Sequence, residues 1–89
     1  MSTTFDACPA VLRHFRLQWE EAQGAWVLLY PEGMVKLNQS AGEIMRRCDG
    51  AHSVSNIVAQ LECAFRANEL TNDVLAFLDM ARKKHWIEG

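Results

Sequence analysis

Hydrophobic and polar residues alternate over the first half of the chain in a way that predicts β-strands. Residues His14–Glu20 carry an apolar side chain at every second position, which is typical of a half-buried strand. Residues Ala25–Tyr30 form an unbroken apolar run rich in β-favouring residues, and residues Val35–Asn38 alternate again. The segments Glu21–Gly24 and Pro31–Gly33 can turn the chain. The sequence therefore predicts an antiparallel meander of three strands.

The hydrophobic period changes from two residues to 3.6 at about Ser40, which predicts a change from strands to helices. Ser40 and Glu43 have the spacing of a capping box, and Gly50 can supply the left-handed residue that ends a helix. Ser53 is a suitable N-cap for a second helix, and Thr71 for a third. The apolar stripes of the three predicted helices are Ala41, Ile44, Met45 and Cys48; Val54, Ile57, Val58, Leu61, Ala64 and Phe65; and Val74, Phe77, Leu78 and Ala81.

Strands that precede helices, rather than alternating with them, indicate the α+β class. A three-stranded antiparallel sheet followed by three helices suggests a winged helix-turn-helix-like arrangement. With 89 residues, of which 49% are hydrophobic, the chain is long enough for one core and too short for two. We therefore expect residues 1–10 to be a flexible N-terminal segment and residues 11–89 to form a single domain.

Charge and composition argue against several classes of function. The formal net charge of -2 gives no attraction to nucleic acid or to an anionic membrane. No apolar run approaches the roughly 20 residues of a membrane span, and residues 1–12 lack the pattern of a signal peptide, so we expect a cytoplasmic protein. Cys8, Cys48 and Cys63 have no CxxC spacing, so neither disulfides nor a zinc site is favoured, and we expect Cys48 to be a buried apolar residue.

The sequence offers no convincing catalytic constellation. His14, His52 and His85 have no cysteine or serine placed beside them, and Glu20–Glu21 flank a turn. There is no glycine-rich phosphate loop and no metal-ligand spacing. The predicted second and third helices carry no basic stripe of the kind that a DNA-recognition helix needs. We therefore expect no enzyme, no metal and no cofactor, and we keep DNA binding by a winged helix-turn-helix only as an alternative.

An interaction surface is a better interpretation. A three-stranded meander leaves two open edges, each a row of unpaired N–H and C=O groups. The edge at Met34–Leu37 precedes the helices, so a groove between it and the third helix can accept an extended peptide as a fourth strand, with Arg82, Lys83 and Lys84 at a positive end. An ordinary edge strand and a helix end matched to its dipole explain the same residues. The uncovered sheet face can instead serve a homodimer through its apolar residues, which are either Val27 and Leu29 or Trp26, Leu28 and Tyr30.

An ordered set of apolar and turn residues runs from Pro9 to Ile87, nearly the whole chain. It comprises Trp26-Val27-Leu28-Leu29, Pro31-Glu32, Leu37-Asn38, Ala41, Ile44, Cys48-Asp49-Gly50, Val54, Ile57-Val58, Leu61, Asp73-Val74 and Phe77-Leu78. This set resembles the pyrroloquinoline quinone (PQQ) biosynthesis protein D family. The chain departs from the family near the end of the last helix, where the family usually has glycine and this sequence has Lys84-His85-Trp86.

The resemblance implies a small peptide chaperone with the fold of a RiPP recognition element, the domain that binds precursor peptides in many peptide-modifying pathways. Such a protein binds the precursor peptide of PQQ by strand addition and presents it to a radical S-adenosylmethionine (SAM) enzyme, which carries out the chemistry. By matched position, the implied peptide-binding residues are Met34, Val35, Lys36 and Leu37 on the strand and Val74, Phe77, Leu78, Ala81 and Lys84 on the helix. We add Arg82 to this set because of its charge at the positive end of the groove.

Overall fold

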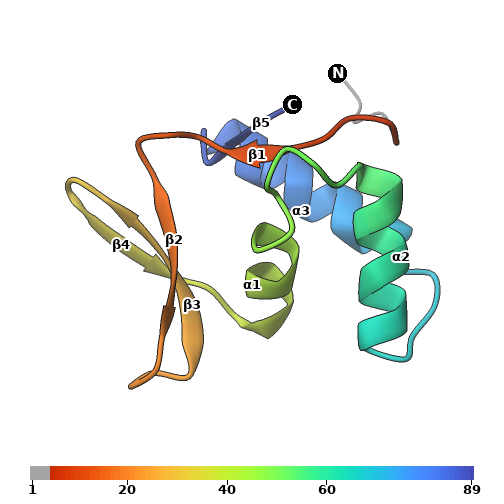
Figure 1. Cartoon of the computed structure of the whole chain (residues 1–89), viewed down its shortest axis with the longest axis horizontal. Coiled ribbons are helices and arrows are strands. Elements are labelled where there is room, and N and C mark those ends of the chain that lie inside the picture. Colours follow the sequence, from red (N-terminus) through yellow and green to blue (C-terminus); the bar gives the residue numbers. More distant parts are fainter. Residues whose placement is uncertain (1–4) are drawn as a thin grey trace.

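The computed structural model describes residues 5–89 (Figure 1). Three of its strands form an antiparallel sheet in the order β2-β3-β4, and the other two, β1 and β5, form a separate pair. The α+β class predicted from the sequence is therefore confirmed. In chain order the elements are β1 (Ala10–Val11), β2 (Arg16–Glu20), β3 (Ala25–Tyr30), β4 (Gly33–Lys36), α1 (Gln39–Met45), α2 (Val54–Ala64), α3 (Thr71–Lys83) and β5 (Ile87–Glu88).

The sheet is a meander with one apolar face turned toward the helices. Leu17 of β2 lies opposite Leu28 of β3, and Leu28 lies opposite Val35 of β4. Because directly opposed residues share a face of the sheet, these three side chains form one apolar row. That row packs against the core that the helices supply, and Figure 1 shows all three helices on the same side of the sheet.

The opposite face of the sheet exposes less apolar surface than the sequence led us to expect. Val27 is at the centre of this face and is 0% exposed, although no helix covers it. Gln18 and Lys36 lie directly opposite Val27 on the two neighbouring strands, and long side chains of this kind cover apolar neighbours with their methylene groups. Leu29 is half-buried, and Met34, its partner on β4, is the exposed apolar residue here.

Helix α1 is capped by Asn38 rather than by Ser40. The side-chain oxygen of Asn38 accepts a hydrogen bond from the Ala41 N–H at 2.8 Å, so the predicted capping box is wrong. Asn38 immediately precedes the first helical residue, where a side-chain oxygen can accept from the free N–H groups of the first turn, whereas Ser40 already lies inside the helix. Glu43 instead accepts a hydrogen bond from Arg47 at 2.8 Å, and this bond lowers the pKa of the Glu43 carboxyl.

The other two helices begin in different ways. Ser53 caps α2 as predicted, since its hydroxyl oxygen accepts a hydrogen bond from the Asn56 N–H at 3.1 Å. Thr71 is not the cap of α3 but its first helical residue, and the N-cap, Leu70, has no side-chain acceptor. The Leu70 N–H donates to the Glu62 carboxylate at 3.0 Å. The chain therefore enters α3 through a contact with α2.

Helices α2 and α3 both end in a left-handed residue that is not glycine. At the end of α3 the Trp86 N–H donates to the Ala81 carbonyl at 2.9 Å, and the intervening His85 has a φ of 61°. This is the Schellman arrangement, in which glycine usually holds the left-handed position. Arg66 holds the equivalent position after α2, with a φ of 51°. The segment Lys84–Trp86 thus replaces the glycine of the family pattern and still ends the helix in the usual way.

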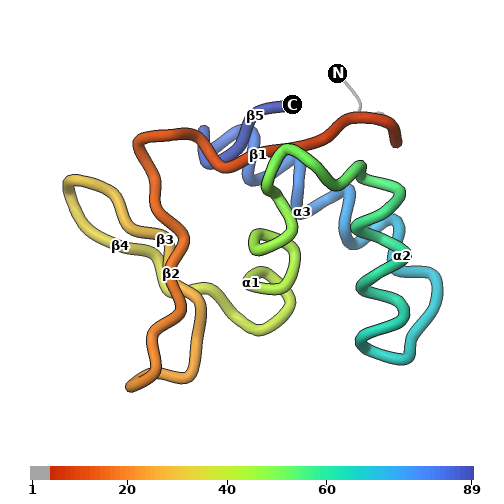
Figure 2. The backbone as a smooth tube through the Cα atoms, viewed as in Figure 1, coloured from red at the N-terminus to blue at the C-terminus, as the bar shows by residue number. Residues whose placement is uncertain are grey.

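The segment expected to be flexible, residues 1–10, makes contacts with the rest of the fold over residues 5–10, and residues 1–4 lie outside the described part of the chain. The Ala7 carbonyl accepts a hydrogen bond from the Val54 N–H at 2.9 Å, at the first turn of α2. Pro9 is fully buried, and the next residues pair with β5. The segment satisfies N–H groups that a helix leaves free at its start. Figure 2 shows it running beside the C-terminal end of the chain.

The core lies between the sheet and the helices. Among its fully buried side chains are Leu28, Met45, Ile57, Leu61 and Leu78. Cys48 is also buried, as predicted, and burial raises the pKa of its thiol to about 12. Within residues 5–89, no helix combines the length and the apolar character that crossing a membrane would require.

Candidate peptide-binding groove

An open groove of about 710 Å³ lies between β4 and α3. One wall comes from β4 and the start of α1, and consists of residues 35–41 and Ile44. The other wall comes from the end of α2, the loop after it, α3 and the residue before β5. Its residues are Leu61, Phe65, Leu70, Asp73, Val74, Phe77, Met80 and Trp86. The groove therefore has the location predicted from the sequence.

The backbone of β4 is open along this groove. The Leu37 N–H donates to the Trp26 carbonyl at 3.0 Å. Because the N–H and C=O groups of successive residues in an antiparallel strand alternate between its two sides, those of Val35 also face β3, whereas those of Met34 and Lys36 face outward. No strand within residues 5–89 pairs with this outer edge. Two residues of β4 thus present unpaired backbone donors and acceptors.

Helix α3 presents one stripe to the groove and another to the core. Asp73, Phe77 and Met80 recur at helical spacing and line the groove. Leu78 and Ala81 are 0% exposed, belong to the core cluster and do not line the groove. Their side chains therefore belong to the core, and the lining of the groove does not support the prediction that they contact the peptide. One residue along a helix turns the side chain by about 100°, enough to move it from one stripe to the other.

The remaining predicted residues of the two walls contribute in different ways. Val74 and Leu37 line the groove but are almost fully buried, so they form its base. Val35 and Phe77 are half-buried and line its sides. The side chain of Met34 lies on the sheet face away from the helices, because Met34 is paired with Leu29 of β3. Met34 therefore reaches the groove edge through its backbone.

The predicted positive end of the groove is smaller than expected. Arg82 donates from Nε to the Gly89 carbonyl at 3.1 Å and pairs with Asp79 at 3.1 Å, so it lies against the C-terminal segment. It does not line the groove, so the geometry does not support its prediction as a peptide contact. Lys83 is exposed and is also absent from the lining. Both residues serve the basic last turn that the α3 dipole favours.

Lys84 is the residue of this basic segment that lies next to the groove. Its Nζ is 5.9 Å from the centroid of the Trp86 ring, and Trp86 lines the groove. An ammonium group over an indole ring is attracted to its π-electrons. Asp73, near the start of α3, places a carboxylate in the same groove. The groove is thus apolar along its length and carries opposite charges toward the two ends of α3.

The sequence prediction missed several groove residues at the end of α2, in the loop after it, in α3 and before β5. Phe65 was placed on the core stripe of α2, yet it is 38% exposed and lines the groove together with Leu70. Met80 and Trp86 were also missed. One signal in the sequence could have identified Phe65 as a groove residue. It is a large apolar residue at the last position of a helical stripe, and a loop follows it. Its position after the helix ends turns it out of the core.

A glycine fixes the position of the α1 wall. A Cβ atom on Gly42 would lie 2.8 Å from Cδ1 and 3.1 Å from Cβ of Trp26. Because this approach is closer than side chains tolerate, only glycine lets α1 pack so near β3. The same turn of α1 carries Ser40, Ala41 and Ile44 into the groove wall. The width of the groove therefore depends on this contact between helix and sheet.

The ion-paired side chains of residues 5–89 lie outside the groove. Across the part of the chain that the structure describes, no three His, Cys, Asp or Glu side chains are grouped to hold a metal ion. The titratable pair His52 and Asp49, with Nδ1 and Oδ1 at 3.0 Å, lies in the connection between α1 and α2. The hydrogen bond from His52 lowers the pKa of the Asp49 carboxyl to about 2. This pair does not line the groove.

Comparison with known proteins gives matches over nearly the whole chain. The family model described as Coenzyme PQQ synthesis protein D (PqqD) matches residues 25–87. A protein of Azotobacter vinelandii named "PqqA binding protein" is 51% identical over 87 residues, which cover 97% of this chain and 95% of that protein. A protein of the same name from Pseudomonas aeruginosa is 50% identical over 86 residues, covering 96% of this chain and 94% of the relative.

Two solved structures share the fold. One is the solution NMR structure of the PqqD truncation of Methylobacterium extorquens PqqCD, which represents a functional, stand-alone RiPP recognition element. It is 27% identical, covers 99% of this chain and 96% of its own, and has a TM-score of 0.80. The other is the crystal structure of PqqD from Xanthomonas campestris, 32% identical, covering 99% and 100%, with a TM-score of 0.59. With its fold, its open strand edge and these matches, the chain belongs to the PqqD family.

Proposed function

We propose that this protein is a peptide chaperone of PQQ biosynthesis that binds the precursor peptide along β4 and presents it to a radical SAM enzyme. The observation that carries the proposal is an unpaired strand edge beside an apolar groove. The names of the relatives support it, since they are called PqqA binding proteins, as does the description of a related structure as a RiPP recognition element.

In this proposal the peptide adds to the sheet as a fourth strand. Its backbone bonds to the outward N–H and C=O groups of Met34 and Lys36, each bond contributing about 0.5–1.5 kcal/mol. Because successive side chains of a strand point to opposite faces, every second side chain of the peptide enters the groove between Val35 and Phe77. The backbone bonds fix the register, and the groove selects the side chains.

The charged residues at the groove set the direction of the peptide. Lys84 attracts an acidic side chain toward the end of α3, and Asp73 disfavours one near its start. The revised set of peptide contacts is the backbone of Met34 and Lys36 and the side chains of Val35, Leu37, Phe65, Leu70, Asp73, Val74, Phe77, Met80, Lys84 and Trp86.

The protein in this proposal is not an enzyme and needs neither metal nor cofactor. The radical SAM partner supplies the iron-sulfur cluster and the chemistry. The chaperone holds the peptide close to that enzyme, so that an encounter between separate molecules becomes a local event at high effective concentration. It also delivers the peptide in one extended conformation, which lowers the conformational entropy lost when the peptide reacts.

The two alternative functions are less well supported. In a DNA-binding winged helix, α2 or α3 would need outward basic side chains, and α2 contains neither lysine nor arginine. A homodimer through the uncovered sheet face would need an apolar surface there. Val27, at the centre of that face, is already buried within the chain.

Titration of the ¹⁵N-labelled protein with the precursor peptide tests the proposal. We expect amide shifts to concentrate at residues 34–38 and at Asp73, Phe77 and Met80, with no metal or cofactor added. A scrambled peptide of the same composition is the control and should produce much smaller shifts. Shifts confined to α2 would contradict the proposal and indicate a helix-turn-helix mode of binding.

A further inference from the structure

The outer edge of β2 is the second open edge of the three-stranded sheet. Within residues 5–89 no strand pairs with it, and its five residues stay in continuous register with β3. Strand edges are usually protected by proline, lysine or a bulge, because an open edge can pair with another chain. β2 contains neither proline nor lysine, and its unbroken register leaves no bulge. This edge is therefore able to accept a further strand.

Two residues of β2 turn their backbone groups outward. The Leu37 N–H donates to the Trp26 carbonyl, which fixes the alternation of backbone groups along β3 and, through it, along β2. The N–H and C=O groups of Gln18 point toward β3. Those of its two neighbours, Leu17 and Trp19, therefore point away from the sheet.

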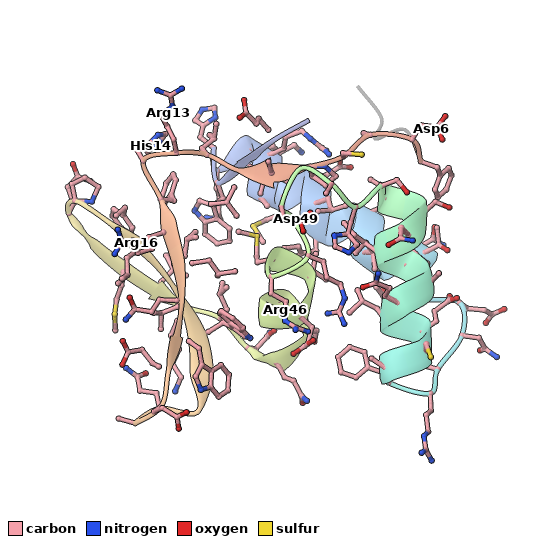
Figure 3. The ribbon with its side chains drawn as sticks, in the orientation of Figure 1. Asp6, Arg13, His14, Arg16, Arg46 and Asp49 are labelled. Carbon is pink, nitrogen blue, oxygen red and sulfur yellow. The ribbon has the colours of Figure 1, made fainter. Side chains whose placement is uncertain are left out.

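The charged side chains at the two ends of β2 have opposite signs and lie on the same face of the sheet. Arg16 and Glu20 are four residues apart, so their Cβ atoms are separated by about 13 Å. Neither makes an ion pair in the part of the chain that the structure describes. The Glu20 carboxylate accepts a hydrogen bond from the Gln18 amide at 2.7 Å. Figure 3 shows Arg16 on the side of the sheet away from the helices.

The other face of this edge carries an exposed aromatic side chain. Trp19 is 44% exposed, although it packs against Trp26 with ring centroids 5.6 Å apart. Leu17 lies on the same face, two residues along the strand, and is half-buried. Because tryptophan is enriched in protein interfaces, its exposure beside an open edge favours an interface here.

We propose that the β2 edge binds the β2 edge of a second copy of this chain, with the two strands antiparallel and related by a twofold axis at Gln18. In this register Leu17 lies opposite Trp19 of the partner subunit, and each such pair exchanges its outward N–H and C=O groups. Arg16 lies opposite Glu20 of the partner subunit, close enough for an ion pair, and the axis generates this pair twice.

The charges favour this register over its neighbours. A shift by one residue would set outward backbone groups against inward ones, so the hydrogen bonds could not form. A shift by two residues would set Gln18 opposite either Arg16 or Glu20 and leave the charges unpaired. The centred register pairs both charges and also packs Leu17 against the exposed Trp19. A second copy supplies these complementary residues by symmetry, which an unrelated strand does not.

Such a dimer leaves both peptide grooves open. Its sheet has the order β4-β3-β2-β2-β3-β4, with the helices of both copies on one side because directly opposed residues share a face. The two β4 edges lie at the outer ends, about 24 Å apart at the usual strand spacing. No residue of β2 lines the groove, so the dimer does not depend on the function proposed for the groove. A single strand pair is a small interface, so we expect a weak dimer that depends on concentration.

Disulfide trapping tests the axis at Gln18. Cys8 and Cys63 are exposed, so both are first replaced by serine. In that background Gln18→Cys places two thiols opposite each other at a Cα separation of about 4.5 Å, which a disulfide can bridge. We expect mild oxidation to give a covalent dimer. Lys36→Cys, on the other edge of the same sheet face, is the matched control and should cross-link much more slowly.

A charge exchange tests the register. The parent should show a monomer–dimer equilibrium when sedimentation is measured over a range of concentrations. Arg16→Glu and Glu20→Arg each turn both ion pairs into like-charge pairs, so dimerisation should weaken about fivefold to twentyfold. The double variant Arg16→Glu/Glu20→Arg restores opposite charges and should dimerise within about twofold of the parent. Lys83→Glu makes the same change of charge on α3 and should leave dimerisation unchanged.

Each of four results would overturn the dimer. A parent that sediments as a monomer even at its highest soluble concentration would mean that a second copy does not occupy this edge. Equal cross-linking of Gln18→Cys and Lys36→Cys would reduce the contact to random collision. A double variant as weak as the single ones would exclude this register. Dissociation of the dimer by the precursor peptide would place the second copy on the β4 edge. Peptide affinity should be unchanged in Arg16→Glu, which keeps this test separate from that of the groove.

Discussion

The two edges of the β2-β3-β4 sheet offer the same backbone chemistry and differ in what lies beside them. The backbone N–H and C=O groups of Val35 and Leu37 point toward β3, where they meet those of Leu28 and Trp26. Because backbone groups alternate along β3, those of Val27 point the other way, toward Gln18 of β2. The N–H and C=O groups of Leu17 and Trp19 are therefore turned outward along β2. They correspond to the outward groups of Met34 and Lys36 along β4. Each edge thus has two residues available for a further strand.

Within residues 5–89, the groove between strand and helix lies along the β4 edge. No residue of β2 lines this groove, and Trp19 of β2 packs against Trp26 of β3 on one face of the sheet, with ring centroids 5.6 Å apart. An open edge can form backbone hydrogen bonds with a peptide of any sequence. A site that recognises one peptide also needs pockets for every second side chain of that peptide. Helix α3 supplies these pockets at β4, and the groove that it lines contains no residue of β2.

Proline substitutions in β4 should have the largest effects and separate folding from binding. Val35→Pro removes an N–H that faces β3, so it should lower the free energy of unfolding by about 2–4 kcal/mol. Lys36→Pro removes an N–H that faces outward, so the fold should persist while peptide affinity falls about threefold to tenfold. Thermal melts followed by circular dichroism and calorimetric titration measure the two quantities.

Two controls complete the proline series. Lys36→Gln keeps the N–H and removes the charge, and it should bind peptide within about twofold of the parent. Trp19→Pro removes an outward N–H from the β2 edge and should leave peptide affinity unchanged, at some loss of thermal stability. If Lys36→Pro and Trp19→Pro weaken binding equally, the two edges are equivalent and strand addition at β4 is wrong.

The two stripes of α3 give the next largest contrast. Leu78→Ala empties a fully buried position and should lower the free energy of unfolding by about 2–5 kcal/mol, with peptide affinity of the folded fraction nearly unchanged. Phe77→Ala, one residue away on the groove stripe, should cost less stability and weaken peptide binding about tenfold. Urea unfolding paired with fluorescence anisotropy separates the two effects. The reverse assignment would return Leu78 to the set of peptide contacts.

A smaller effect should follow from moving the α1 wall. Gly42→Ala forces the new methyl group against Trp26 and should lower the free energy of unfolding by about 1–3 kcal/mol while displacing the groove wall. Gly33→Ala is the matched control, because its Cβ would meet the Tyr30 hydroxyl at an ordinary 3.5 Å. Urea unfolding should show little change in this control. Equal stability of the two variants would mean that α1 moves freely against the sheet.

The smallest expected effect concerns the charge at the end of the groove. Lys84→Gln should weaken binding of an acidic peptide about twofold to fivefold at low salt, and the difference should vanish at high salt. Lys83→Gln removes the same charge one residue away from the groove and should leave affinity unchanged. Stopped-flow association at several salt concentrations distinguishes them. A stronger salt effect from Lys83→Gln would show that the basic turn acts as a whole.

The sequence predicted the elements of the fold better than it predicted the side chains of the site. Alternation fixes which residues of a strand share a face, so the meander followed from the pattern. The pattern allowed either a groove beside Met34–Leu37 or an ordinary edge strand, and the family resemblance favoured the groove. The outward direction of Met34 and Lys36 did not follow from the pattern, because it depends on a single bond between Leu37 and Trp26. Leu78 and Phe77 are equally apolar in sequence, and only the rotation of α3 in the fold separates them.

Contacts between distant segments account for the other differences. Nothing in the sequence of residues 5–10 signals that the Ala7 carbonyl serves the first turn of α2. The left-handed turn at His85 was hidden because the residue there is not glycine. Asn38 displaced Ser40 as the cap because the end of β4 places it at the start of α1. In each case the sequence allows more than one local hydrogen-bonding arrangement, and contacts with distant parts of the fold determine which one forms.

The pairing of β1 with β5 has a consequence for how this domain can be joined to other polypeptides. Ala10 lies opposite Glu88 and Val11 opposite Ile87, so the last strand pairs with a segment close to the start of the chain, on strands other than the one that borders the groove. A polypeptide joined beyond β5 would therefore begin at this strand pair and not on β4. The Methylobacterium extorquens relative is a truncation of the longer PqqCD chain, which is one natural instance of such covalent fusion.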